Sequence, residues 1–414
     1  MRLKNFSRSG HWPTLLMSFL YFDISFMVWV LLGVLGVYVA KDFNLSAGQK
    51  GLLVALPILG GSLVRIPMGV LVDRIGPKRT GILGQLMVML PLLWAWKGGS
   101  SLSQVMELGF LLGVAGGSFA VALPLASRWY PPEHQGLAMG IAGAGNSGTV
   151  LTALFAPRLA ETFGWHAVFG MALIPVSVVL CLFILFAREH PSQPSPKPLR
   201  AYFAILRQRD TLWFSLLYCF TFGGFVGLAS FLVIFFHDQY GVSKVNAGTL
   251  TALCVFSGSF MRPIGGYLAD RFGGVRVLTI LLACSAACLA AVATLPPIVL
   301  VAPLIFATMG TLGLGNGSVF QLVPQRVRKE IGMATGLIGA AGGLGGFLLP
   351  SLLGILKGMT GRFGAGFLLL GLAGATCLAL MLVQRKRWLE SLLPASRNDL
   401  VAVVPLDSAD VARN

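Results

Sequence analysis

The chain has 414 residues, of which 56% are hydrophobic and 11% are charged, and its mean hydropathy is +0.80. Because a soluble globular domain carries roughly a quarter charged residues, this composition excludes an ordinary soluble domain and indicates a membrane protein. The net charge of +16 is strongly positive, so a nucleic-acid partner also has to be considered.

Apolar stretches follow one another along the whole chain, and a membrane span needs about 20 such residues. The first has the full length of a span, unlike the shorter apolar core of a signal peptide. A proline-rich segment beginning at Arg188 separates the sixth stretch from the seventh and is expected to be a linker. The expected helices are 12–39, 48–72, 79–98, 104–128, 135–158, 165–187, 211–236, 246–271, 275–294, 297–324, 331–356 and 363–385.

A long sequence repeat indicates that these helices form two related halves. The stretch 61–79 recurs 197 positions later as 258–276, with nine of nineteen aligned positions identical. Repeats of this kind indicate a duplicated architecture. We therefore predict an all-α membrane protein with twelve transmembrane helices in two pseudo-symmetric six-helix halves. The predicted parts are an N-terminal half (1–187), a cytoplasmic linker (188–210), a C-terminal half (211–386) and a weakly ordered cytoplasmic tail (387–414).

The basic residues are distributed unevenly between the two sides of the membrane. If both termini are cytoplasmic, 22 lysines and arginines lie on the cytoplasmic side and 7 on the other, and Arg65 and Arg262 complete the total of 31. This asymmetry satisfies the positive-inside rule. It predicts a multi-pass protein of the cytoplasmic (inner) membrane, and it explains the positive charge without a nucleic-acid partner.

Two arginines are predicted to lie deep in the membrane. Arg65 precedes Asp73 by eight residues, or about 12 Å of helix, and Arg262 has the same offset from Asp270. In a hydrocarbon layer about 30 Å thick this position is close to the middle. Each such arginine costs at least ~2.5 kcal/mol, and two that face one cavity also repel each other. A guanidinium is a planar, permanently charged fork of donors, so the pair is suited to a small planar oxyanion.

The alternative is that a fixed carboxylate neutralises each arginine. Asp23 is the only acid well inside an early span, and one acid cannot neutralise two arginines. We therefore favour anion binding, which is also the usual role of an ionisable residue inside a membrane.

The fifth and eleventh predicted helices are rich in glycine. In the eleventh, Gly332, Gly336, Gly339, Gly343 and Gly346 alternate four and three apart and form one stripe. Small residues let membrane helices approach closely, which is a structural role. A glycine-lined face beside a cavity can also slide and expose its backbone to a small ligand. The fifth helix adds a polar exception, Asn146, whose amide can donate to an anion.

Neither the cysteines nor the histidines indicate a metal site or a cofactor. All six cysteines lie in apolar segments without paired spacing, and the five histidines lie at segment ends or in loops. No nucleophile triad or phosphate-binding glycine loop is recognisable, so we expect neither an enzyme nor an ATPase.

The layout resembles that of the major facilitator superfamily over nearly the whole chain. The residues Gly69-x-x-x-Asp73-Arg74-x-Gly76-x-Lys78-Arg79 are similar to its cytoplasmic signature after the second helix, and a degenerate copy includes Asp270 and Arg271. By that resemblance, these acidic and basic residues have structural and gating roles. Substrate lies near the middle of the membrane, between halves that move against each other.

Five stretches narrow the resemblance to the nitrate/nitrite porter family. They are FMVW (26–29), GGSFA (116–120), AGNSG (144–148), LYCFTFG (217–223) and AGGLGG (341–346). The resemblance implies a secondary transporter of nitrate and nitrite, with no cofactor and membrane lipid as its surroundings, and we expect a monomer. The implied substrate contacts are Arg65 and Arg262 as a clamp, Asn146 and Tyr218 as donors, Phe26, Phe119 and Phe222 as walls, and Gly145 and Gly342 in the paired glycine signatures.

Asp23 is consistent with two different driving forces for transport. It lies one turn from Phe26 and could carry a proton, which would make the protein a nitrate/proton symporter. It could equally be a structural partner of Arg65 or a capping residue, as in a nitrate/nitrite exchanger with fixed charges. Two other functions also remain open: transport of a short carboxylate, and a membrane anion sensor that no longer transports.

Overall fold

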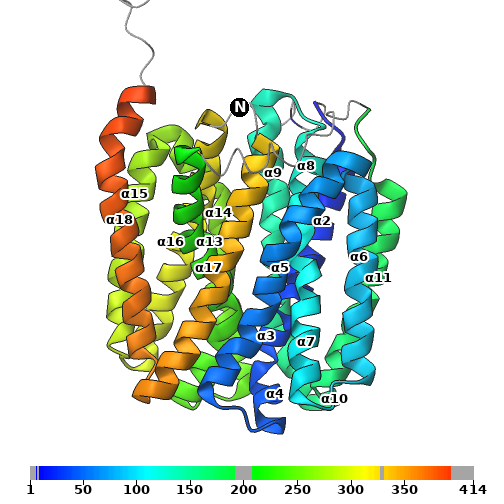
Figure 1. Cartoon of the computed structure of the whole chain (residues 1–414), viewed down its shortest axis with the longest axis vertical. Coiled ribbons are helices and arrows are strands. Elements are labelled where there is room, and N and C mark those ends of the chain that lie inside the picture. The colour runs from blue at the N-terminus through cyan, green and yellow to red at the C-terminus, as the bar shows by residue number, and fades with distance from the viewer. Residues whose placement is uncertain (1–5, 7–8, 192–207, 327–330, 393–414) are drawn as a thin grey trace, which may run out of the picture.

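The computed structural model describes Phe6 and residues 9–191, 208–326 and 331–392. Within these ranges there are three interrupted and nine continuous helices, twelve in all, and no strand. The helices lie side by side as long rods (Figure 1). Ten are long and apolar enough to cross a membrane, and α6 and α14 are the other two. The prediction of an all-α protein is confirmed.

Three rods are interrupted. The first consists of α2 (Trp12–Trp29), α3 (Leu31–Val34) and α4 (Gly36–Asp42). The fourth consists of α7 (Leu102–Leu112), the 3₁₀ segment η1 (Gly113–Ser118) and α8 (Phe119–Ser127). The fifth consists of α9 (Pro132–Gly143), the 3₁₀ segment η2 (Ala144–Ser147) and α10 (Gly148–Phe163).

The other rods are continuous. They are α5 (Ala47–Ile75), α6 (Pro77–Lys97), α11 (Trp165–Phe186), α13 (Arg209–Tyr240), α14 (Lys244–Phe272), α15 (Gly274–Ala293), α16 (Ile298–Arg326), α17 (Ile331–Thr360) and α18 (Gly364–Leu392).

The sequence repeat produces the same local turn twice. Gly76 alone joins α5 to α6 with φ +89°, and Gly273 alone joins α14 to α15 with φ +87°. Residues with side chains rarely adopt this left-handed region, so glycine allows each helix to end and the next to begin after a single residue. Pro77 then starts α6, where its missing N–H costs no helical hydrogen bond.

The 3₁₀ segments differ from the continuous helices that the sequence predicts. Both lie in glycine-rich stretches at places of close backbone approach. At Gly113 an added Cβ would lie 2.5 Å from the backbone of Gly60, and at Gly145 it would lie 2.7 Å from the carbonyl oxygen of Phe19. A mid-helix change to 3₁₀ geometry often marks a functional position. Here the changes immediately precede Phe119 and include Asn146.

The last helix is longer than predicted. The sequence places its end near Arg385 and assigns the following residues to a weakly ordered tail, but α18 continues to Leu392. The reason is Trp388, which is buried, packs against Phe214 with ring centres 5.2 Å apart, and donates from Nε1 to Asp210 at 3.1 Å. These contacts hold the C-terminal end of α18 against α13, so the helix continues beyond its predicted end. Residues 393–414 of the predicted tail and 192–207 of the predicted linker lie outside the described residues.

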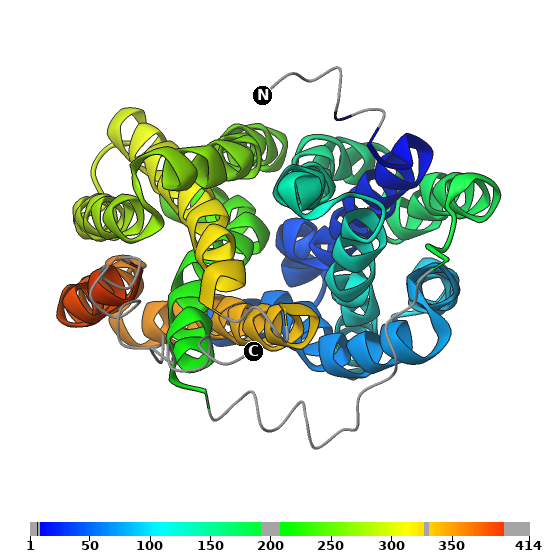
Figure 2. The same ribbon diagram turned by 90° about the horizontal axis from the view of Figure 1, so that it is seen from above.

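The helices up to α11 and those from α13 onward occupy opposite sides of the molecule (Figure 2). The boundary between them, which we call the seam, is formed by α5 packing against α17 and by α10 packing against α14. Glycines allow this close contact along α5 and α17: an added Cβ on Gly343 would lie 2.8 Å from the Ser62 Cβ, and one on Gly354 would lie 2.9 Å from the Gly51 Cα. Ser62 also donates across the seam to the carbonyl of Ala340 at 2.5 Å.

Candidate functional site

Arg65 lies on α5 and is completely buried at the seam. Its Nε donates to the carbonyl of Gly116 in η1 at 3.0 Å, and its Nη1 donates to the carbonyl of Gly339 on α17. These acceptors come from both sides of the molecule. The second amino group, Nη2, has no hydrogen-bond partner among the described residues.

Arg262 lies on α14 and is only 6% exposed. Its Nη2 donates to the Tyr218 hydroxyl at 3.2 Å, whereas Nη1 has no partner in the part of the chain that the structure describes. Its guanidinium faces Gly143, where an added Cβ would lie 3.7 Å from Cζ. Each arginine therefore lies against a glycine of the opposite side, Arg65 against Gly339 and Arg262 against Gly143.

Aromatic rings surround both guanidiniums. The Phe119 ring centre is 5.2 Å from Cζ of Arg65 and 5.9 Å from Cζ of Arg262, so this ring is close to both charges. The Phe222 ring lies 5.0 Å from Cζ of Arg65 and stacks on Tyr218 at 4.9 Å. Phe26 contacts Phe222 at 6.3 Å. Aromatic faces attract cations and keep water away, which increases the strength of any charge–charge interaction in the site.

The two positive charges are not neutralised by the protein. Neither guanidinium forms an ion pair with a carboxylate within the described ranges. Buried donors without acceptors are rare, and a buried unpaired charge costs several kcal/mol, roughly. Two such cations, each with one amino group unpartnered among the described residues, have the chemistry of an anion-binding site.

Asn146 adds a further donor. It is fully buried in η2, and neither its side-chain nitrogen nor its side-chain oxygen has a partner in the described part of the chain. Its carbonyl accepts from the hydroxyls of Thr149 at 2.7 Å and Ser259 at 3.5 Å, so its backbone is held from both sides of the seam.

The two predicted glycines occupy different environments. An added Cβ on Gly342 would lie 2.6 Å from the Tyr218 ring and 2.9 Å from the Phe222 ring, so Gly342 makes room for these two site residues. Gly145 lies against the backbone of α2, 2.9 Å from the nitrogen of Asp23 by the same construction.

Asp23 lies on α2 beside the site and is paired with Ser147 rather than with Arg65. The Ser147 hydroxyl donates to Oδ1 of Asp23 at 2.6 Å. Ser147 directly follows Asn146 in η2. A change in the charge of Asp23 would therefore alter its hydrogen bond with Ser147 and, through Ser147, the position of the Asn146 amide.

Three residues of the site were not predicted from the sequence. The Trp29 ring lies 5.1 Å from Cζ of Arg65, and its Nε1 donates to the carbonyl of Pro57 at 2.7 Å. On α16, Phe320 lies 5.8 Å from Cζ of Arg262 and 4.9 Å from the Tyr218 ring. The third is Asn316, described next.

Asn316 lies one helical turn before Phe320, on the same face of α16. It is fully buried, and both ends of its amide are without a partner among the described residues. The adjacent Gly317 packs against the backbone of Arg262. An asparagine inside an apolar span was the sequence signal that could have identified this residue.

The predicted gating residues lie at the end of the molecule where α5 and α14 finish. Asp73 pairs with Arg128 at 3.6 Å, and Asp270 accepts from Nε2 of Gln321 at 2.9 Å. Arg74 and Arg271 are exposed there.

Comparisons with known proteins identify the family of this chain. Residues 17–350 match the sequence profile described as the Major Facilitator Superfamily. The chain is 36% identical over 354 residues to the nitrite extrusion protein of Bacillus subtilis (strain 168), covering 83% of this chain and 87% of that protein. It is 33% identical over 392 residues to the "Probable nitrate/nitrite antiporter NarK1" of Thermus thermophilus, covering 83% of this chain and 85% of that protein.

A solved structure shares the fold. A bacterial homologue of the human lysosomal transporter Spinster, in an inward-facing and occupied conformation, superposes with a TM-score of 0.68 at 18% identity and covers 92% of this chain and 98% of its own. At this identity the likeness concerns the fold alone.

Proposed function

Since this chain belongs to the major facilitator superfamily, with relatives named as nitrate and nitrite transporters, we propose that it carries nitrate, and nitrite with it, across the cytoplasmic membrane by alternating access. The cytoplasmic location of both termini is part of this proposal and rests on the distribution of basic residues.

The observation that carries the proposal is the pair of buried, unneutralised arginines. The unpartnered Nη2 of Arg65 and Nη1 of Arg262 are donors with fixed direction, and the Asn146 amide is a third donor without an acceptor. Nitrate and nitrite are small planar anions with oxygen acceptors, and planar forks of N–H groups suit them. We assign Tyr218 to hold Arg262, and Phe26, Phe119 and Phe222 to exclude water.

The anion also provides a reason for the two sides to move. Without it, Arg65 and Arg262 repel each other across the seam, and each lies against a glycine of the opposite side. An anion between them removes the repulsion and favours closure around it. We propose that residues 1–187 and 211–386 rock as two units, with Asp73, Arg74, Asp270 and Arg271 forming contacts that change between conformations.

Asp23 distinguishes two driving forces. If Asp23 exchanges a proton while bound to Ser147, uptake of nitrate follows the proton gradient. If Asp23 only holds Ser147 and η2 in place, nitrate moves in exchange for nitrite. Both are consistent with the arginine clamp.

The test is nitrate uptake into liposomes that contain the purified protein, driven either by an inward proton gradient or by internal nitrite. Gradient-driven uptake that is lost in Asp23→Asn establishes symport. Uptake that needs internal nitrite and survives Asp23→Asn establishes exchange. If neither condition moves nitrate while formate or oxalate is transported, the substrate is a short carboxylate, and anion binding without any flux identifies a sensor.

A further inference from the structure

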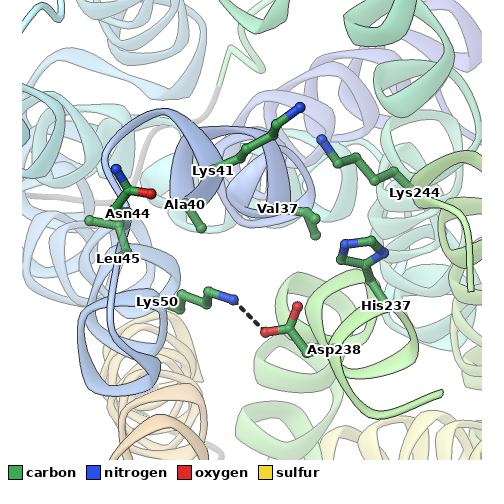
Figure 3. Close-up of a pocket in the computed structure, with 9 residues that line it drawn as sticks. All are labelled: Val37, Ala40, Lys41, Asn44, Leu45, Lys50, His237, Asp238 and Lys244. Carbon is green, nitrogen blue, oxygen red and sulfur yellow. Dashed lines mark hydrogen bonds and ion pairs between the residues drawn. The ribbon is translucent and has the colours of Figure 1, made fainter. Parts of the chain in front are cut away.

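A second basic cavity lies on the seam, far along the helices from the arginine pair. It has a volume of about 370 Å³ and is formed by the end of α4 and the start of α5 on one side, and by the end of α13 and the start of α14 on the other (Figure 3). The predicted orientation puts this end of the molecule outside the cytoplasm. Its polar lining consists of Lys41, Asn44, Lys50, His237, Asp238 and Lys244.

Three lysines and only one carboxylate line this cavity. The carboxylate, Asp238, is already paired: Oδ2 lies 2.5 Å from Nζ of Lys50, across the seam, and the two side chains are only 20% and 21% exposed. His237 directs Nδ1 to the carbonyl of Val242 at 2.7 Å, so this nitrogen is engaged in its own loop.

Lys41 and Lys244 remain unpaired. Their ammonium groups approach each other from opposite sides of the seam (Figure 3). Neither forms an ion pair or a hydrogen bond within the described residues, and Lys244 only lies over the Tyr38 ring at 4.2 Å. Lys41 is exposed and Lys244 is half-buried, so solvent screens part of their repulsion, and an anion between them would remove the remainder.

Two carboxylates outside the lining keep their negative charge and offset part of the positive charge of Lys244. Asp42 and Glu161 lie within electrostatic range of Lys244. Asp42 accepts from Nε1 of Trp165 at 2.7 Å, and Glu161 accepts from the Tyr38 hydroxyl at 3.3 Å. They moderate the positive charge, but neither enters the cavity.

We propose that this cavity is a second binding site for a small inorganic anion, held between Lys41 and Lys244. Because one lysine belongs to each side of the seam, the bound anion ties the outer ends of the two sides together, as the Lys50–Asp238 ion pair does beside it. The outer ends close when the cavity is occupied. That nitrate is the physiological occupant rests on the proposed function, whereas anion binding itself does not.

The test uses a protein whose central site has been disabled. Thermal unfolding of the purified Arg65→Lys/Arg262→Lys variant is measured with sodium nitrate or sodium chloride, against sodium gluconate at the same ionic strength. We expect a remaining rise in Tm of roughly 1–2 °C with nitrate or chloride, because a ligand that binds only the folded state stabilises it. Adding Lys41→Gln and Lys244→Gln should abolish this rise.

Lys97→Gln is the matched control, because Lys97 lies at the same end of the molecule, over Trp96 at 4.0 Å, and does not line the cavity. It should leave the rise in Tm unchanged. No remaining rise in the arginine variant, or a rise that survives Lys41→Gln and Lys244→Gln, overturns the proposal. Nitrate uptake by the unaltered protein is measured separately, so failure of the second site is distinguishable from failure of the nitrate assignment.

Discussion

Arg65 and Arg262 are held in different ways, although the sequence repeat makes them equivalent. Arg65 donates to two backbone carbonyls, those of Gly116 and Gly339. Arg262 donates to one side-chain hydroxyl, that of Tyr218. One acceptor of Arg65, Gly339, lies on the opposite side of the seam, whereas the acceptor of Arg262, Tyr218, lies on its own side.

This geometry predicts that charge alone is insufficient at position 65. Arg65→Lys should reduce nitrate uptake roughly tenfold or more while the protein remains folded. A lysine ammonium lacks the planar fork of donors, so it cannot hydrogen-bond to the carbonyls of Gly116 and Gly339 and to the anion at the same time. Uptake into liposomes measures this. Arg362→Lys is the control, since Arg362 is exposed between α17 and α18, away from the clamp. Normal uptake by Arg65→Lys would refute the clamp.

A second prediction at this scale concerns Asn316. Its unpartnered amide lies one turn from Phe320, so Asn316→Leu should raise the KM for nitrate by about two- to tenfold, the equivalent of one hydrogen bond. Gln85→Leu removes another buried amide, one that accepts from Ser25 at 3.3 Å in a different part of the molecule. That control should leave KM unchanged. Equal effects of the two substitutions would show that Asn316 acts only through stability.

At the scale of helices, the glycines of α17 divide into two environments. An added Cβ on Gly343 would lie 2.8 Å from the Ser62 Cβ, whereas one on Gly336 would meet no atom of the described residues within 4 Å. The glycine stripe is therefore tightly packed against α5 in the middle of the molecule and open at Gly336. One helix thus combines a close contact with a gap, which is what a surface that slides or opens requires.

The expected consequence is a difference between two identical substitutions. Gly343→Ala should lower the Tm of the purified protein, because the methyl group must push α17 away from α5. Gly336→Ala should leave Tm unchanged or raise it slightly, because alanine favours the helix and has room. Thermal unfolding in detergent compares them directly. Similar losses in both variants would mean that the spacing between the helices is not set by glycine contact.

At the scale of the whole molecule, contacts across the seam decide which end is closed. Lys50 and Asp238 join the two sides at the end where α4 finishes, and their side chains are 21% and 20% exposed. The predicted gating residues lie at the opposite end, and Asp73–Arg128 connects helices of the same side. The structure therefore has an ion pair across the seam at one end, and the roles of Asp73, Arg74, Asp270 and Arg271 stay predictions.

A double-mutant cycle tests the Lys50–Asp238 contact. Lys50→Gln and Asp238→Asn should each lower Tm, and the combined variant should lose less than the sum of the two, with a coupling of about 0.5–1 kcal/mol. Ion pairs weaken with salt, so the coupling should shrink at high ionic strength. Purely additive losses would show that the pair does not hold the two sides together.

The sequence by itself determined the broad architecture of this protein. Its composition indicated a membrane protein, its apolar stretches predicted the helices, and the repeat placed Arg65 and Arg262 at equivalent depth. These properties are local or periodic, so they can be read without knowing which helices touch. The one-residue turns at Gly76 and Gly273 are shorter than the breaks that the sequence predicted, 73–78 and 272–274.

Only the tertiary structure shows which residues from distant parts of the chain contact one another. That Gly339 accepts from Arg65, that Ser147 rather than Arg65 engages Asp23, and that Trp388 extends α18 all depend on contacts between residues far apart in the chain. Helical periodicity shows which residues share a face but not what that face meets. For the same reason, the lysine cavity at the seam became visible only once the two sides were brought together. Asn316 is visible in the sequence as an asparagine inside an apolar span, and the structure adds that the adjacent Gly317 packs against Arg262.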